Sequence, residues 1–220
     1  MQERLDRMGE CFGERSLVVR RGADLSRLRA AVERYIEGKT PGRNGNLQGG
    51  PGWSGVVVEY WNVVKSHIKG ISHCQSSPSV RIKEGAGVGP YETSKLHSDI
   101  FAGDPSGVVV MIPLWGDIEF GGVEFFSPTK NFDQFRGYSD YSFAPDFGPE
   151  YLGKMEEGYI HFVDAYCLHK TSLGKRRVSL DHRLIFDRFI AGDTKGTRLR
   201  NYVHIDNFPC TDTTASCTAI

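Results

Sequence analysis

The first third of the chain carries apolar residues at helical spacing. Between residues 24 and 39, Leu, Val, Tyr and Ile recur every three or four positions, which predicts an amphipathic helix. Asp24 or Ser26 can cap its first turn. A second apolar stripe, from Val57 to Ile68, predicts another helix over residues 54–69 that packs on a neighbouring element.

The pattern changes to short apolar runs from Ser79 onward. Valine, isoleucine and aromatic residues alternate with polar ones, and Gly, Pro or Asp separates the runs, which is typical of β-strands. The predicted strands cover residues 79–85, 93–101, 107–116, 121–126, 158–166 and 176–189. Closely spaced strands after two helices favour a mainly β fold with flanking α-helices, arranged as a sandwich or barrel.

Three segments show neither the helical spacing nor the strand alternation of apolar residues. Residues 40–55 are dense in Gly, Pro and Asn and predict a long loop without regular structure. Residues 131–153 are rich in Tyr, Phe, Asp and Gly and predict an excursion between strands that can cover a site. Residues 211–220 predict a frayed tail.

Composition narrows the class of protein. A length of 220 residues fits one domain with its own core. Lys plus Arg and Asp plus Glu both number 27, so no net field attracts nucleic acid or a membrane surface, and a small-molecule partner is expected. The five cysteines form no C-x-x-C pair, and no apolar stretch is long enough for a membrane helix. A soluble cytoplasmic protein is expected, and its oligomeric state stays open.

Two imidazoles and one carboxylate are the candidate metal ligands. His97 and Asp99 lie two residues apart on a predicted strand, so both side chains leave the same face. His-x-Asp alone occurs by chance in many proteins, and a third ligand must come from elsewhere. His169, which follows an apolar strand, is the best candidate. Such a facial set suits Fe(II) and leaves open positions for oxygen and a co-substrate.

A polar strand follows the third candidate ligand. Arg177, Ser179 and Arg183 lie at even offsets and share one face. The guanidinium fork matches a carboxylate bidentately, and a serine hydroxyl adds a donor. The alternative is a charged edge strand whose arginines are only solvated.

Three stretches carry a family resemblance. They are GPYETSKLHSD at residues 89–99, the spacing of Gly158, Phe162 and His169, and RVSLDHR at residues 177–183. Together these motifs resemble the Fe(II)/2-oxoglutarate-dependent dioxygenase superfamily. The chain is most similar to its phytanoyl-CoA hydroxylase-like and streptomycin-biosynthesis-type bacterial members.

The resemblance implies a double-stranded β-helix, a jelly-roll or cupin-like barrel, with N-terminal helices packed outside it. It also implies a single dioxygenase domain over residues 1–220. Within that domain, we expect a helical flank at 24–71, a jelly-roll core at 79–190 and a C-terminal extension at 191–220.

The resemblance also implies site residues. His97, Asp99 and His169 bind Fe(II), and an arginine on the strand after the last histidine binds the distal carboxylate of 2-oxoglutarate. Arg177 is favoured because Arg-x-Ser matches the family motif, with Arg183 as the alternative. Further positions that can hydrogen-bond the co-substrate are Arg81, Tyr91 and Thr93.

The implied activity is an O2-dependent hydroxylation of a small metabolite, coupled to decarboxylation of 2-oxoglutarate to succinate. Two other functions stay open. One is a metal-dependent cupin-type isomerase or dioxygenase that does not use 2-oxoglutarate. The other is a non-catalytic jelly-roll module in which His97 and Asp99 are paired by chance. The substrate is not identified, because its pocket is built from variable loops.

Overall fold

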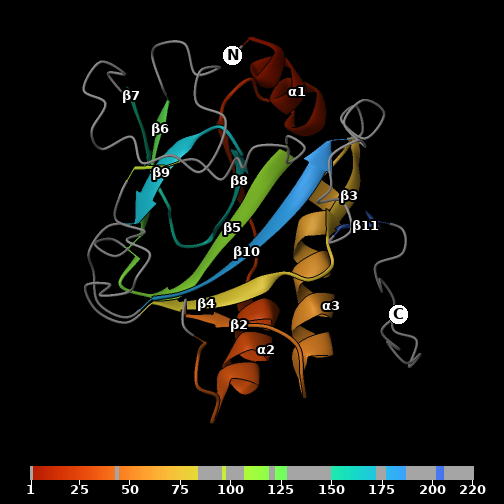
Figure 1. Ribbon diagram of the computed structural model, residues 1–220, viewed down its shortest axis with the longest axis vertical. Helices are drawn as coiled ribbons and strands as arrows, with labels where there is room; N and C mark the ends of the chain where they lie inside the picture. The colour runs from red at the N-terminus through yellow and green to blue at the C-terminus, as the bar shows by residue number, and fades with distance from the viewer. Residues whose placement is uncertain are drawn as a thin grey trace.

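Strands make up most of the regular structure. In the computed structural model (Figure 1), the described residues are 2–42, 45–83, 96–97, 107–118, 122–127, 150–171, 177–186 and 202–205. The elements are α1 (Gln2–Phe12), β1 (Val18–Gly22), α2 (Ser26–Ile36), β2 (Asn46–Leu47), α3 (Trp53–Val64), η1 (Lys65–His67), β3 (Ile71–Gln75), β4 (Ser79–Lys83), β5 (Gly107–Gly116), β6 (Val123–Ser127), β7 (Glu150–Lys154), β8 (Tyr159–Asp164), β9 (Leu168–Thr171), β10 (Arg177–Phe186) and β11 (Tyr202–His204). Among these residues, no helix has the length and apolar character needed to cross a membrane.

The strands form two antiparallel sheets. The large sheet has the order β1-β8-β5-β10-β3-β11, while β4 also pairs with β10 and carries β2 on its other side. The small sheet has the order β7-β6-β9. An isolated antiparallel bridge joins His97 to His169 of β9, so His97 lies at the edge of the small sheet beside β9.

Alternate residues of β5 show how the layers stack. Val110 and Ile112 are buried in the apolar cluster that contains α2 and α3. Val109 and Met111 are buried in a second cluster with Phe125 of the small sheet. Successive side chains of a strand point to opposite faces, so both faces of the large sheet are covered. The layers are therefore helices, large sheet and small sheet, which is a β-sandwich with flanking helices.

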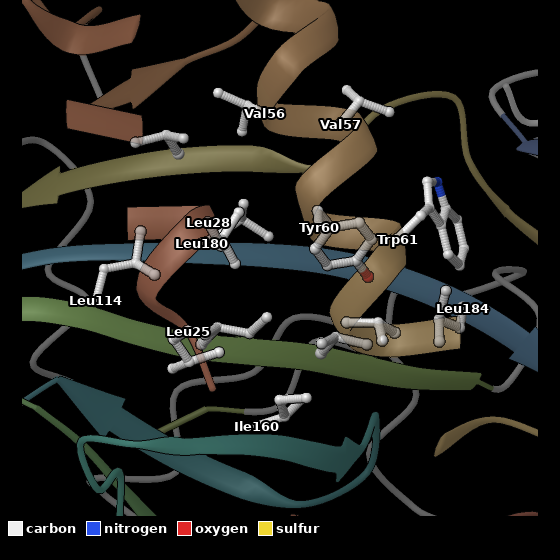
Figure 2. Packing of buried hydrophobic residues seen from close by; sticks show 14 of the residues in the cluster. Leu25, Leu28, Val56, Val57, Tyr60, Trp61, Leu114, Ile160, Leu180 and Leu184 are labelled. Carbon is white, nitrogen blue, oxygen red and sulfur yellow. The ribbon is translucent and has the colours of Figure 1, made fainter. Parts of the chain in front are cut away.

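The helices seal the outer face of the large sheet. Figure 2 shows Leu28 of α2 and Tyr60 of α3 close to Leu180 of β10. His182 of β10 is buried beside them; its Nε2–H donates to the Gln75 carbonyl at 2.9 Å, and its Nδ1 accepts from the Tyr60 hydroxyl at 2.9 Å. Burial lowers the pKa of His182 to about 4, so the imidazole is neutral at pH 7.

Both predicted helices are confirmed. The N-cap residue of α2 is Leu25, which makes no side-chain capping bond, so the prediction that Asp24 or Ser26 caps the first turn was wrong. The Asp24 carboxylate instead accepts the backbone N–H of Ser26 at 2.9 Å in the turn that leads into the helix. The second predicted helix is α3, which continues as the short 3-10 helix η1. The mainly β fold class is also confirmed, with predicted strands present as β4, β5, β6, β8 and β10. The predicted strand 93–101 lies outside the described residues except for Leu96 and His97.

Two segments predicted to be irregular contain strands, so those predictions were wrong in part. Within 40–55, β2 pairs with β4 because Gly45, with a φ of 72°, lets its carbonyl accept the Ile82 N–H at 2.7 Å. A side chain at Gly45 would overlap the Ile82 carbonyl. The end of segment 131–153 belongs to β7, which pairs with β6.

Candidate metal centre

Two histidines face each other across the isolated bridge at the edge of the small sheet. The backbone N–H of His97 donates to the His169 carbonyl at 2.9 Å, and the return bond from His169 to His97 is 2.7 Å. Residues that exchange both bonds lie directly opposite, with side chains on one face. Their ring centroids are 4.4 Å apart, and each residue is 6% exposed. The backbone thus brings two imidazoles together in a buried position.

The carbonyl of Cys167 orients one of these rings. Nδ1 of His169 lies 3.3 Å from that oxygen, and because a carbonyl only accepts, Nδ1 carries the proton. Nε2 then carries the lone pair, as in a metal-ligating histidine. The Cys167 thiol is fully buried and its pKa is raised by burial, so it is a packed, protonated thiol.

The separation of the two rings fits a single metal ion. With a metal–nitrogen bond of about 2.1 Å, an ion lies about 3.2 Å from each ring centroid, so centroids 4.4 Å apart correspond to bonds at about 90°. Adjacent ligands of an octahedral ion make a ligand–metal–ligand angle of about 90°, and octahedral Fe(II) accepts imidazole ligands. The two histidines therefore fit iron.

The register of the sheets shows which way these rings point. His169 is directly opposite Phe125 of β6, and Phe125 packs in the cluster between the sheets. Cross-strand partners share a face, so His97 and His169 are directed at the large sheet. Phe125 is fully buried and keeps water from that side of the histidine pair.

The facing side of the large sheet is strongly cationic. Val178 and Leu180 of β10 and Ile82 of β4 point to the helices; alternation therefore directs their neighbours toward the small sheet. These neighbours include the side chains that we call the cationic group: Arg81, Lys83 and Arg177.

Arg177 and Lys83 are a like-charged pair inside this group. They are directly opposite each other on β10 and β4, and Arg177 is only 2% exposed. Burial, then the charge of Arg81, lowers the pKa of Arg177 to about 10. Burial, then Arg81 and Arg177, also lowers the pKa of Lys83. Like charges opposite one another in a dry environment are destabilising unless an anion joins them.

Asp181 provides a negative charge beside the group, and Arg81 already binds it. Nε and Nη2 of Arg81 donate to the two carboxylate oxygens at 2.6 and 2.8 Å. Among the described residues, Arg81 therefore forms a two-point ion pair with Asp181 at the edge of the cationic group.

The other predicted residues are placed as follows. Ser179 is buried opposite Arg81, on the face of the cationic group. Arg183 is half-buried on the same face, six residues beyond Arg177. The remaining ones, Asp99, Tyr91 and Thr93, lie outside the described residues. Within the described part of the chain, no set of three metal-binding side chains is found, so the two histidines are what the structure brings together.

Several solved structures have a fold similar to that of this chain. The epimerase SnoN, crystallised with Fe3+, α-ketoglutarate and a nogalamycin compound, superposes with a TM-score of 0.57, at 14% identity over 83% of both chains. The carbocyclase SnoK of nogalamycin biosynthesis gives 0.51, at 14% identity over 84% of both chains. The chain has the fold of the non-heme, α-ketoglutarate-dependent enzymes.

Further comparison agrees with this α-ketoglutarate-dependent enzyme fold. A Trichoplax adhaerens prolyl hydroxylase, in complex with a hypoxia inducible factor peptide, has a TM-score of 0.51 at 13% identity, covering 86% of this chain and 91% of its own. No family model and no curated protein matches the sequence.

Lys83 is the site residue that the sequence analysis missed. The alternation in the predicted strand 79–85 puts Lys83 on the same face as Arg81, and this signal was sufficient to find it. Its position opposite Arg177 was not predictable from the sequence. Between Lys83 of β4 and Arg177 of β10 lie 93 residues, and more than one strand order is possible for two strands so far apart in the chain.

Proposed function

We propose that this protein is an Fe(II)- and 2-oxoglutarate-dependent oxygenase that acts on a small metabolite. The observation that carries the proposal is the buried His97–His169 pair, on a face directed at the large sheet whose facing side carries the cationic group. In this proposal one domain spans the chain, and its two sheets are the two halves of a double-stranded β-helix.

Each residue has a defined task in this proposal. His97, Asp99 and His169 hold the iron, with the Cys167 carbonyl fixing the His169 tautomer. Arg177 and Lys83 bind the distal carboxylate of 2-oxoglutarate, because a charge-assisted bond to an anion relieves their mutual repulsion. The Ser179 hydroxyl is the third donor to this carboxylate. When bound, iron and 2-oxoglutarate supply the oxygen activation and the decarboxylation to succinate.

The outcome that we propose is hydroxylation of a substrate carbon. SnoN is named an epimerase and SnoK a carbocyclase, so epimerisation and ring closure are the alternatives that product analysis distinguishes. The protein's contribution is the same in each case: it positions the co-substrate between the histidine pair and the cationic group and excludes water with residues such as Phe125.

Turnover of the co-substrate tests the proposal. Purified protein with Fe(II), ascorbate and 2-oxoglutarate is expected to form succinate, and His169→Ala is expected to abolish it. Arg177→Met should raise the 2-oxoglutarate concentration needed for half-maximal rate by about tenfold or more. His67→Ala is the control, since His67 lies on η1 and outside the site. Iron binding without any use of 2-oxoglutarate would instead support the cupin-type alternative.

A further inference from the structure

A second pair of histidines lies across β3 and β11 of the large sheet. His73 and His204 are directly opposite in the antiparallel register, and their ring centroids are 5.0 Å apart at 78°. Side chains at directly opposed positions share a face. His204 is exposed and His73 is half-buried, so an ion from solvent can reach both rings.

We propose that His73 and His204 form a second transition-metal site, distinct from the histidine pair of the small sheet. With a metal–nitrogen bond of about 2.1 Å, centroids 5.0 Å apart correspond to nitrogen–metal bonds at about 100°, within the range of tetrahedral coordination. The site therefore takes a divalent ion that accepts imidazole, such as Zn(II), Ni(II) or Cu(II).

A neighbouring hydroxyl supports a metal-ligand role for His73. The Ser72 hydroxyl lies 2.8 Å from Nδ1 of His73, and ligating histidines are commonly held by such a bond at the other ring nitrogen. The proposed site consists of the two histidines, both of which are among the described residues.

The position of the pair indicates what a bound ion does. Within the described residues 202–205, β11 pairs with β3 through three residues, of which His204 is one. Short strands at a sheet edge are weakly attached, and an ion that bridges His73 and His204 fastens β11 to the sheet. The ion binds the folded chain and not the unfolded one, so it stabilises this attachment.

Calorimetric titration of untagged protein with Ni(II) tests the proposal. The wild-type protein is expected to bind two ions, and His204→Ala is expected to weaken one of them by about tenfold or more. The double variant His97→Ala/His169→Ala should keep the site that His204→Ala removes. His67→Ala removes a histidine elsewhere and should change neither site. Circular dichroism shows that each variant is folded.

The outcome that overturns the proposal is also defined. If His204→Ala and His73→Ala both leave the number of ions and their affinities unchanged, the pair is only a ring contact. The same holds if folded His97→Ala/His169→Ala binds no Ni(II). The result does not depend on succinate formation, so failure of the proposed oxygenase activity and failure of this second site are separate observations.

Discussion

Replacing Arg177 by methionine is expected to stabilise the metal-free protein while it weakens co-substrate binding. Arg177 is 2% exposed and lies opposite Lys83. Burial, then the charge of Arg81, lowers its pKa to about 10, and a displacement of this size from an ordinary arginine corresponds to about 3 kcal/mol against the charged form. Methionine keeps the apolar stem without the charge, so the substitution removes the free-energy cost of burying this guanidinium. We therefore expect Arg177→Met to raise the free energy of unfolding by about 2 kcal/mol.

Urea unfolding measures this change. Metal-free wild-type and Arg177→Met proteins are compared first, then both with Fe(II) and 2-oxoglutarate under nitrogen. At a co-substrate concentration of about 100 times Kd the wild type gains about 2.7 kcal/mol, and the variant should gain much less. Arg81→Met is the matched control, because it removes the partner of the Asp181 carboxylate and should destabilise. A metal-free Arg177→Met protein that is less stable than the wild type would refute the reasoning.

Two further predictions concern buried titratable groups away from the site. Burial lowers the pKa of His182 to about 4, so below pH 6.5 the folded state binds fewer protons than the unfolded state. The free energy of unfolding therefore decreases as the pH is lowered. The loss from pH 7 to pH 5 is about 2 kcal/mol, and His182→Gln should lose that much less in urea unfolding; equal losses contradict the assignment. Arg4 pairs at 2.9 Å with Asp164, whose side chain is 1% exposed. Arg4→Met should therefore destabilise by about 2–3 kcal/mol, whereas Arg15→Met, which breaks an exposed pair, should cost less than about 1 kcal/mol in thermal unfolding.

The periodic segments of the fold were predictable from the sequence. The strand 107–116 was predicted with the bounds that β5 has, because a long run of Val and Ile between glycines has one clear interpretation. By contrast, β2 and β11 have two and three residues, too few to show a period. Their pairing depends on contacts with β4 and β3, which are distant in the sequence.

The sequence provided candidate residues for the site, but it did not provide their arrangement. Histidine and arginine positions followed from spacing and family resemblance, whereas the opposition of His97 and His169 depends on strand register. Register across residues far apart in sequence is fixed by the whole sheet, not by a local motif. For the same reason, the sequence did not show that Asp181 binds Arg81 and that Lys83 faces Arg177.

Anaerobic titration with Fe(II) and then 2-oxoglutarate tests the central claim most directly. A co-substrate that chelates iron held by His97 and His169 gives a metal-to-ligand charge-transfer band in the visible range. The account predicts this band in the wild type, its loss in His169→Ala, and a higher 2-oxoglutarate requirement in Arg177→Met. Iron bound to the wild-type protein without the band at saturating 2-oxoglutarate would contradict the account.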